Sequence, residues 1–228
     1  MKNIYKMFLA ITVLVLASLA CQAVTSPKSD NPPANDEPQG SDNVIFSDDF
    51  SSAQWGTGTD ADSAIEYVNG ALNFNIFTEN YFAWSTPNAE TYQDIHMEVT
   101  LINNDTHPTT AFGLVCNKAT GDNFYYVAMT PAGQYAIALA KEGETDLFLT
   151  NNDLWADSDL IAVDADSYRI GMDCGNGRLT LYVDGQQIAS VADATYTSGG
   201  VAVLAWSGED TGVTTNVSFD DFVITELP

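Results

Sequence analysis

Cationic residues are scarce in this chain. It has 7 Lys and Arg residues against 31 Asp and Glu residues, and its formal net charge is −24. A protein that binds a nucleic acid needs a stripe of lysine and arginine to neutralise phosphates, and this chain has none. Nucleic acid is therefore excluded as a partner.

Histidine is scarcer still, which excludes several kinds of catalytic site. His96 lies on the polar side of an alternating stretch, and His107 lies in the loop Asn-Asp-Thr-His-Pro. We interpret both as surface histidines, because two isolated imidazoles make neither a histidine-rich metal site nor a nucleophile–histidine pair. Glycine-rich motifs that would cradle a phosphate are also absent.

The N-terminus predicts export. Lys2 and Lys6 precede an apolar run over residues 7–16, which is too short to span a bilayer comfortably and is followed by Ala-Ser-Leu-Ala-Cys21. This end resembles the lipobox of bacterial lipoproteins, although Ser18 stands where the lipobox usually has leucine. The resemblance implies that residues 1–20 are a signal peptide, that Cys21 carries lipid, and that the protein is anchored outside the cytoplasm on the cell envelope.

A linker and one domain follow. Residues 22–42 hold four of the eight prolines and no aromatic residue, so we predict a disordered tether over 21–42. Without the signal peptide, 5 Lys and Arg residues remain against 31 acids, giving a formal charge of 5 − 31 = −26. Residues 43–228 keep one character throughout and form one predicted domain.

Alternating hydrophobicity dominates that domain. Ile95, Met97 and Val99 alternate with polar residues, as in half-buried strands, and no stretch shows helical spacing. Asn69-Gly70 and Asp184-Gly185 have the residues that tight hairpin turns require. We predict strands near 44–50, 64–68, 71–77, 81–86, 94–103, 110–118, 123–130, 134–141, 145–150, 167–174, 178–184, 187–191, 199–206 and 216–226. This pattern predicts an all-β antiparallel sandwich.

Two cysteines remain after Cys21. Cys116 and Cys174 both continue period-two apolar patterns, so each is expected on a buried face. An even pair in an exported protein favours a disulfide bond.

Four segments give the domain a family resemblance. They are Phe46-Ser-Asp-Asp-Phe50 followed by Trp55, Asn123-Phe-Tyr-Tyr126, Leu179-Thr-Leu-Tyr-Val-Asp-Gly185 and Phe219-Asp-Asp-Phe-Val223. They resemble bacterial concanavalin A-like lectin/glucanase domains, in particular laminin-G-like and 3-keto-disaccharide-hydrolase-like jelly rolls. The resemblance covers nearly all of 43–228 and implies two curved antiparallel sheets with adjacent terminal strands. It also implies a ligand on the concave sheet or at its rim loops.

The glucanase branch of that superfamily uses Glu-x-Asp-x-Glu or Glu-x-Asp-x-x-Glu, which places its acids on one face of a strand. Glu144-Thr-Asp146 is the only Glu-x-Asp in the chain, and the third acid is missing. We therefore expect no catalytic residues of this kind and interpret Glu144 and Asp146 as loop or strand-edge charges. A carboxylate pair contributed by separate strands stays open.

Sugars are held by aromatic faces and by polar side chains that bond hydroxyl groups. Tyr125 and Tyr126 must face opposite sides of a sheet, so one of them faces away from the core. The candidate ligand-binding residues are Trp155, Tyr125, Tyr126, Asn123, Trp84 and Trp206, with core packing as the alternative explanation for each aromatic residue.

Aspartate makes up 22 of the 31 acids, which favours either a solvated acidic coat or cation ligation in loops. Two candidate calcium clusters follow. Pairing of the terminal strands would bring together the first, Asp48, Asp49, Asp220 and Asp221, and the second lies in one loop and consists of Asp153, Asp157 and Asp159.

Taken together, the sequence favours a surface-tethered lipoprotein whose jelly-roll domain binds an extracellular glycan without catalysing a reaction. Two alternatives stay open: a glycoside-processing hydrolase of the 3-keto-disaccharide-hydrolase-like kind, and an adhesion or envelope-scaffold module that binds a protein partner.

Overall fold

The computed structural model describes residues 43–104, 107–208, 212 and 214–228. The predicted signal peptide, the lipidation of Cys21 and the tether lie outside the described residues and stay predictions. In the described part of the chain, no helix is long and apolar enough to cross a membrane.

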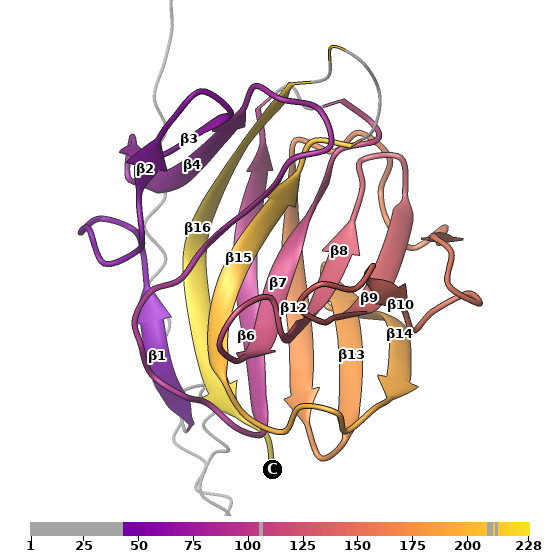
Figure 1. The fold of residues 1–228 in the computed structure, drawn as a ribbon. Helices are drawn as coiled ribbons and strands as arrows, with labels where there is room; N and C mark the ends of the chain where they lie inside the picture. Colours follow the sequence, from indigo (N-terminus) through magenta and orange to yellow (C-terminus); the bar gives the residue numbers. More distant parts are fainter. Residues whose placement is uncertain (1–42, 105–106, 209–211, 213) are drawn as a thin grey trace, which may run out of the picture. The chain divides into compact units, whose positions relative to one another are not determined.

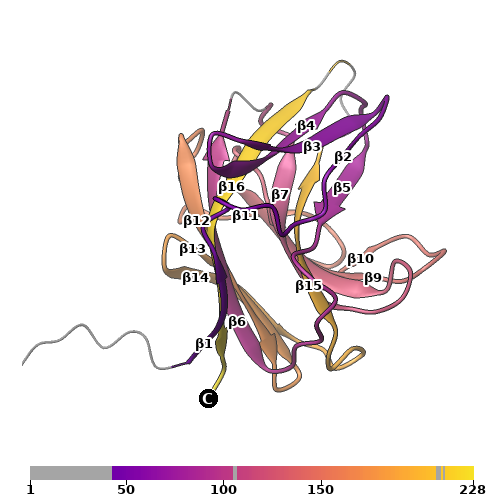
Figure 2. The same ribbon diagram turned by 90° about the vertical axis from the view of Figure 1, so that its left-hand side faces the viewer.

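The described residues form two antiparallel β-sheets that face each other as two layers (Figures 1 and 2). Sheet A has nine strands. Eight of them follow in the order β14 (Gln186–Ala192), β13 (Arg178–Val183), β12 (Ser167–Gly175), β6 (Ile95–Asn103), β16 (Thr215–Glu226), β4 (Ala71–Ile76), β3 (Ser63–Val68), β2 (Gly58–Thr59). The ninth, β1 (Val44–Asp48), pairs with β16. Sheet B has seven strands, with β11 (Ala156–Asp157) paired to β9 and the order β10 (Leu147–Phe148), β9 (Gln134–Ala140), β8 (Phe124–Met129), β7 (Ala111–Lys118), β15 (Gly200–Trp206), β5 (Phe82–Ser85). The predicted all-β sandwich is confirmed.

Period-two alternation produces the core between the sheets. On β8, Tyr125, Val127 and Met129 pack into the main core, whereas Phe124 and Tyr126 belong to a second apolar cluster on the other face of sheet B. The two consecutive tyrosines therefore face opposite sides, as predicted. Both hairpin turns are also confirmed, because Asn69 and Asp184 adopt positive φ angles of 54° and 50°.

The terminal strands are adjacent, as the family resemblance implied. Val44 to Asp48 of β1 pair with residues 222–225 of β16, while the first half of β16 pairs with β4. A register shift between Asp220 and Val223 separates the two halves, and Asp221 adopts a positive φ of 49° there. This bulge bends β16, so that one long strand serves two neighbours on the same side.

The predicted disulfide is present and joins the two layers. Cys116 on β7 of sheet B is bonded to Cys174 on β12 of sheet A, and both residues are fully buried. Two short strands, β2 and β11, were not predicted, because two residues are too few to show alternation.

Candidate functional site

The outer face of sheet B is apolar, which is unusual for a face that has no third layer over it. Alternate residues of β7, β8, β9 and β15 build it, and most of those in the middle of the sheet are small. They are Ala111, Val115, Phe124, Tyr126, Ala128, Ala138, Ala140, Ala202 and Leu204. Figure 2 shows sheet B curving so that β5 at one edge and β9–β10 towards the other edge flare to the same side. Small side chains on a concave face leave room above them.

A groove of about 560 Å³ occupies that room. Its floor is formed by Ala111, Ala128 and Leu204, and aromatic rings make up most of its walls. The wall residues are Asn80, Phe82, Tyr126, Thr145, Asp146, Phe148, Trp155 and Trp206. A concave, mostly apolar site with a few polar groups is the usual form of a small-molecule site.

Two tryptophans stand side by side in the wall. The rings of Trp155 and Trp206 lie 6.4 Å apart between centroids, with planes only 13° apart. Phe148 meets Trp155 edge-on, at 5.3 Å and 81°. The Trp206 indole Nε1 donates a hydrogen bond of 3.0 Å to Asn80 Oδ1. These contacts hold both indoles in fixed orientations, as a stacking surface requires.

The loop that carries Trp155 contains a strained backbone. Asn151, Asn152 and Asp153 have φ angles of 47°, 54° and 66°, which form a short left-handed run. Each such residue costs about 1–2 kcal/mol for an ordinary side chain and less for Asn or Asp. Side-chain contacts hold the run: Asn151 Nδ2 donates to the Trp155 carbonyl oxygen at 2.6 Å, and the Phe148 amide donates to Asp153 Oδ1 at 2.8 Å. The strained loop therefore fixes the backbone of both Phe148 and Trp155.

Replacing Asp153 with alanine should lower the free energy of unfolding by about 2 kcal/mol, because it removes this hydrogen bond and forces alanine into a left-handed conformation. Asp153→Asn keeps an acceptor oxygen and tolerates the backbone, so it should lose less than about 0.5 kcal/mol. Urea unfolding of both variants measures the difference. Equal losses would show that the carboxylate oxygen does not hold the loop.

One carboxyl group enters the groove. Tyr126 Oη donates a hydrogen bond of 2.9 Å to Asp146 Oδ2. Burial raises the pKa of Asp146, the hydrogen bond from Tyr126 opposes this, and the negative charge of Asp122 adds to the rise in pKa. Burial also raises the pKa of Tyr126, which keeps the phenol protonated as the donor. Among the described residues that line the groove, Asp146 is the only acid, and none is Lys, Arg or His.

The structure brings three of the predicted ligand-binding residues together: Tyr126, Trp155 and Trp206 all line the groove. Trp84 lies on the outer side of β5, 37 % exposed, with Lys118 Nζ 5.3 Å from its ring centroid, and it does not line the groove. Asn123 holds a turn, accepting hydrogen bonds from the Glu142 amide and from Tyr196 Oη, each at 3.2 Å.

Of the two neighbouring tyrosines, Tyr125 is the one on the core side of sheet B. Its ring is fully buried in the core and its hydroxyl donates to Asp193 Oδ1, so it does not reach the groove. Sequence reasoning missed Asn80, Phe82 and Phe148, and it interpreted Asp146 as a loop or strand-edge charge. Only Phe82 left a signal, because it alternates with Trp84 and therefore faces the same side of its strand.

The candidate calcium clusters do not assemble. In the part of the chain that the structure describes, no three His, Cys, Asp or Glu side chains are placed to share a metal ion. Near the termini, Asp48 accepts hydrogen bonds from the Phe50 amide and Trp55 Nε1, Asp49 accepts one from the Ser51 amide, and Asp220 accepts one from the Asp221 amide.

In the loop cluster, the carboxylate of Asp153 is bonded to the Phe148 amide and that of Asp157 lies 3.3 Å from Gln134 Nε2, while Asp159 follows in the same loop. These carboxylates stabilise turns, and calcium binding stays a prediction without an assembled site.

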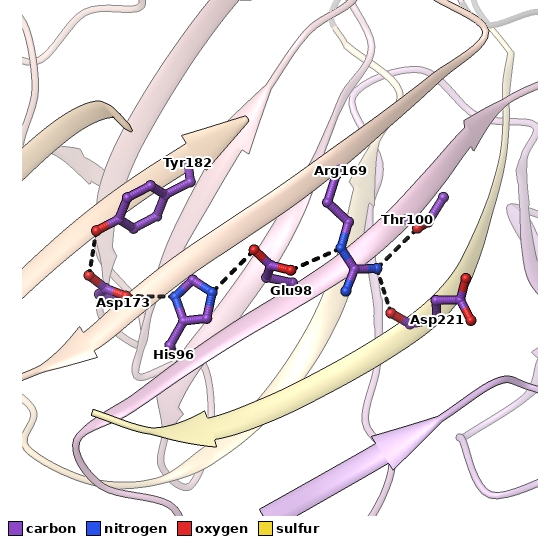
Figure 3. Close-up of polar contacts among 7 residues, drawn as sticks. All are labelled: His96, Glu98, Thr100, Arg169, Asp173, Tyr182 and Asp221. Atoms are coloured by element: carbon purple, nitrogen blue, oxygen red, sulfur yellow. Dashed lines mark hydrogen bonds and ion pairs between the residues drawn. The ribbon is translucent and has the colours of Figure 1, made fainter. Parts of the chain in front are cut away.

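The outer face of sheet A differs, because it carries a network of polar side chains from β6, β12, β13 and β16 (Figure 3). His96 lies between two carboxylates, with Nδ1 2.7 Å from Asp173 Oδ1 and Nε2 3.3 Å from Glu98 Oε1. Tyr182 donates to Asp173 at 2.7 Å, and Arg169 Nε donates to Glu98 at 3.1 Å. His96 is thus on the polar face, as predicted, but it is a bonded member of a network.

This network makes the free energy of unfolding depend on pH. The hydrogen bond with Asp173, followed by that with Glu98, raises the pKa of His96 to about 9, from 6.5. A raised pKa in the folded state stabilises the fold fully below pH 6.5 and loses that effect as pH rises through 9. We expect a loss of about 1–2 kcal/mol over this window, since a quarter of the His96 side chain remains in water. Calorimetry across the window measures it.

His96→Gln is the control for that prediction, because glutamine has no charge to lose. Its unfolding free energy should be lower than that of the wild-type protein below pH 6.5, and the decline up to pH 9 should be absent. A variant that shows the same decline would assign it to another group.

The second histidine, His107, is exposed, and its Nδ1 lies 2.9 Å from Thr109 Oγ1.

No family model matches the sequence. No curated protein matches it either. Solved structures with the same fold do match the structure of this chain. A carbohydrate-binding module, CBM66 from Bacillus subtilis, is 14 % identical, with a TM-score of 0.57 over 76 % of this chain and 96 % of that one. A β-glucanase from Bacillus licheniformis is 11 % identical, with a TM-score of 0.56 over 83 % of this chain and 100 % of that one.

A third similar structure, a protein with a galectin-like fold from Bacillus subtilis, is 13 % identical, with a TM-score of 0.59 over 81 % of this chain and 96 % of that one. These TM-scores establish the shared fold, whereas identities this low leave the activity open. The chain therefore has a concanavalin A-like jelly-roll fold, of the architecture found in carbohydrate-binding modules and glucanases.

Proposed function

We propose that the groove on the outer face of sheet B binds a glycan, and that the protein is a carbohydrate-binding lipoprotein tethered outside the cytoplasm. The observation that carries the proposal is the nearly parallel pair of Trp155 and Trp206 rings beside a small-residue floor. Sugar rings stack their C–H faces on such surfaces. Similar structures are named as a carbohydrate-binding module and as glucanases, which supports a glycan as the ligand.

Binding without hydrolysis is supported by the acids of the groove. Glycoside hydrolysis needs two carboxyl groups on either side of the scissile bond, about 5–10 Å apart. Among the described residues lining the groove, Asp146 is the only acid, and its Oδ2 already accepts the Tyr126 hydroxyl hydrogen bond. The floor that would lie under the bond is apolar.

The experiment that tests the proposal is a glycan array probed with residues 22–228, the chain without its lipid anchor, in millimolar calcium and again in chelator. Binding to a defined class of sugar is the expected result, and loss of binding in chelator would add a calcium ion to the protein. Folded protein that leaves the array silent under both conditions would contradict the proposal. Release of new reducing ends from a bound glycan would instead favour the hydrolase.

A protein-binding scaffold is the second candidate. The loop around β11 exposes Leu154, Leu160 and Val163 by 63 %, 56 % and 65 %. Exposed apolar side chains in one loop are typical of protein contacts when they form a continuous patch. A silent glycan array combined with capture of an envelope protein, lost when the three residues are changed to serine, would favour this function.

A further inference from the structure

The groove combines aromatic rings with a single negative charge. Five rings line it, those of Phe82, Tyr126, Phe148, Trp155 and Trp206, together with the carboxyl group of Asp146. The faces of aromatic rings carry a negative quadrupole and attract cations, most strongly where water is excluded. A neutral sugar needs only the rings. The carboxyl group adds a negative charge, which a neutral ligand does not require.

None of the described residues that line the groove carries a positive charge to balance Asp146. The lining contains no Lys, Arg or His, and the charge that acts on Asp146 is that of a second acid, Asp122. Tyr126 donates to Oδ2, while Oδ1 accepts no hydrogen bond from the described residues. One carboxylate oxygen of the groove is therefore available to a donor on the ligand, and the charge on the group favours a donor that is positive.

The cations of the described residues are placed elsewhere. Lys118 lies over Trp84, and Arg178 donates to Ser190 on sheet A. Arg169 and His96, on the same sheet, are both bonded to Glu98. Lys141 acts electrostatically on Asp193, outside the groove. With a formal net charge of −24, the chain also concentrates small cations and repels anions over its surface. Local and overall charge therefore favour the same kind of ligand.

We propose that the groove selects glycans that carry a free amino group, with the ammonium of an amino sugar bonded to Asp146 and the sugar ring stacked on the indole pair. This inference rests on the proposed function and adds the class of ligand to it. Acidic sugars, such as uronic acids and sulfated units, are rejected by the same charge. An N-acetylated sugar keeps the ring contacts but loses the charge, so it binds more weakly.

Calorimetric titration of residues 22–228 with three β-1,4-linked tetrasaccharides, of glucosamine, N-acetylglucosamine and glucose, tests the inference near neutral pH. The glucosamine tetrasaccharide should bind at least about tenfold more tightly than the other two, and the gap should narrow as salt is added. This comparison uses only the wild-type protein, so it does not depend on a variant that folds.

Asp146→Asn should abolish the preference and leave the weaker, ring-based affinity, because asparagine keeps the shape without the charge. Glu144→Gln is the matched control: it removes one charge from the same loop at a residue outside the groove, and the preference should survive. The glycan array widens the test to other linkages, where free-amine glycans should exceed their acetylated forms.

The outcomes separate this inference from the proposed function. Equal affinities for the three tetrasaccharides, tighter binding of the acetylated one, or array binding by neutral glycans alone would overturn the preference for an amino group while leaving glycan binding in place. A preference that survives Asp146→Asn would overturn the assignment of Asp146. Failure of every glycan on the array and in titration would overturn both.

Discussion

Trp155→Ala should lower the affinity of the groove for its glycan by roughly 30-fold. The indole presents a flat apolar surface, and covering about 80 Å² of apolar area with a sugar ring is worth about 2 kcal/mol, which corresponds to that factor. The truncation also removes the neighbour of two other wall residues, because the Trp155 ring lies beside the nearly parallel ring of Trp206 and receives the edge of Phe148. Isothermal titration with a glycan identified on the array measures the loss.

Trp84→Ala is the matched control for that experiment. Trp84 is a tryptophan on the same sheet with a comparable or larger exposed surface, but it lies outside the groove and beneath Lys118. Its truncation should change the affinity less than about threefold. If Trp84→Ala weakened binding as much as Trp155→Ala, the ligand would extend over β5 and beyond the groove. Full affinity in Trp155→Ala would place the ligand elsewhere.

Loss of the disulfide should lower the free energy of unfolding by about 4 kcal/mol. The bond closes a loop of 58 residues, and the chain-entropy relation for a loop of that length gives this value. For a domain of this size the melting temperature should fall by about 8–16 °C. The bond joins β7 of one sheet to β12 of the other. Without it, the segment between the two cysteines gains conformational freedom in the unfolded chain.

A reducing agent alone is a poor test, since both sulfur atoms are buried and are reached only when the protein opens. Wild-type protein should be reduced in denaturant, refolded with reductant present, and compared with oxidised protein treated in the same way. Cys116→Ala with Cys174→Ala gives an independent value that includes the lost packing of two sulfur atoms. A change below about 1 kcal/mol in the reduced protein would show that the native fold does not depend on the cross-link.

Local patterns predicted much of the fold. The alternation Ile95, Met97, Val99 corresponds to β6, and the turn at Asp184-Gly185 joins β13 to β14. The disulfide followed from two cysteines on expected buried faces in a chain predicted to be exported. These features succeed because strand periodicity and positive φ angles are properties of a few neighbouring residues, whatever the rest of the chain does.

The candidate site was predicted in part. Trp155 was singled out because a tryptophan in a polar loop has little local reason to be there, and the structure places it in the groove. Tyr125 and Tyr126 could not be separated, because alternation shows that they face opposite sides without showing which side is the core. Asp146 was noticed only as part of the Glu-x-Asp pattern and was interpreted as a loop or strand-edge charge, because the sequence does not show that Tyr126 comes within hydrogen-bond distance of it.

The sequence by itself determined most of the strands, the hairpin turns, the acidic charge from which we expect no nucleic-acid partner, and the cysteines available for a cross-link. Only the tertiary structure decided which face of sheet B is apolar and hollow, and that residues 80, 126, 146, 155 and 206 meet there. The reason is physical: strand formation depends on neighbours in sequence, whereas a groove depends on strand order, sheet curvature and loop backbone, which bring distant residues together. The carboxyl group of Asp146 acquires its raised pKa and its place beside the indoles only through that assembly.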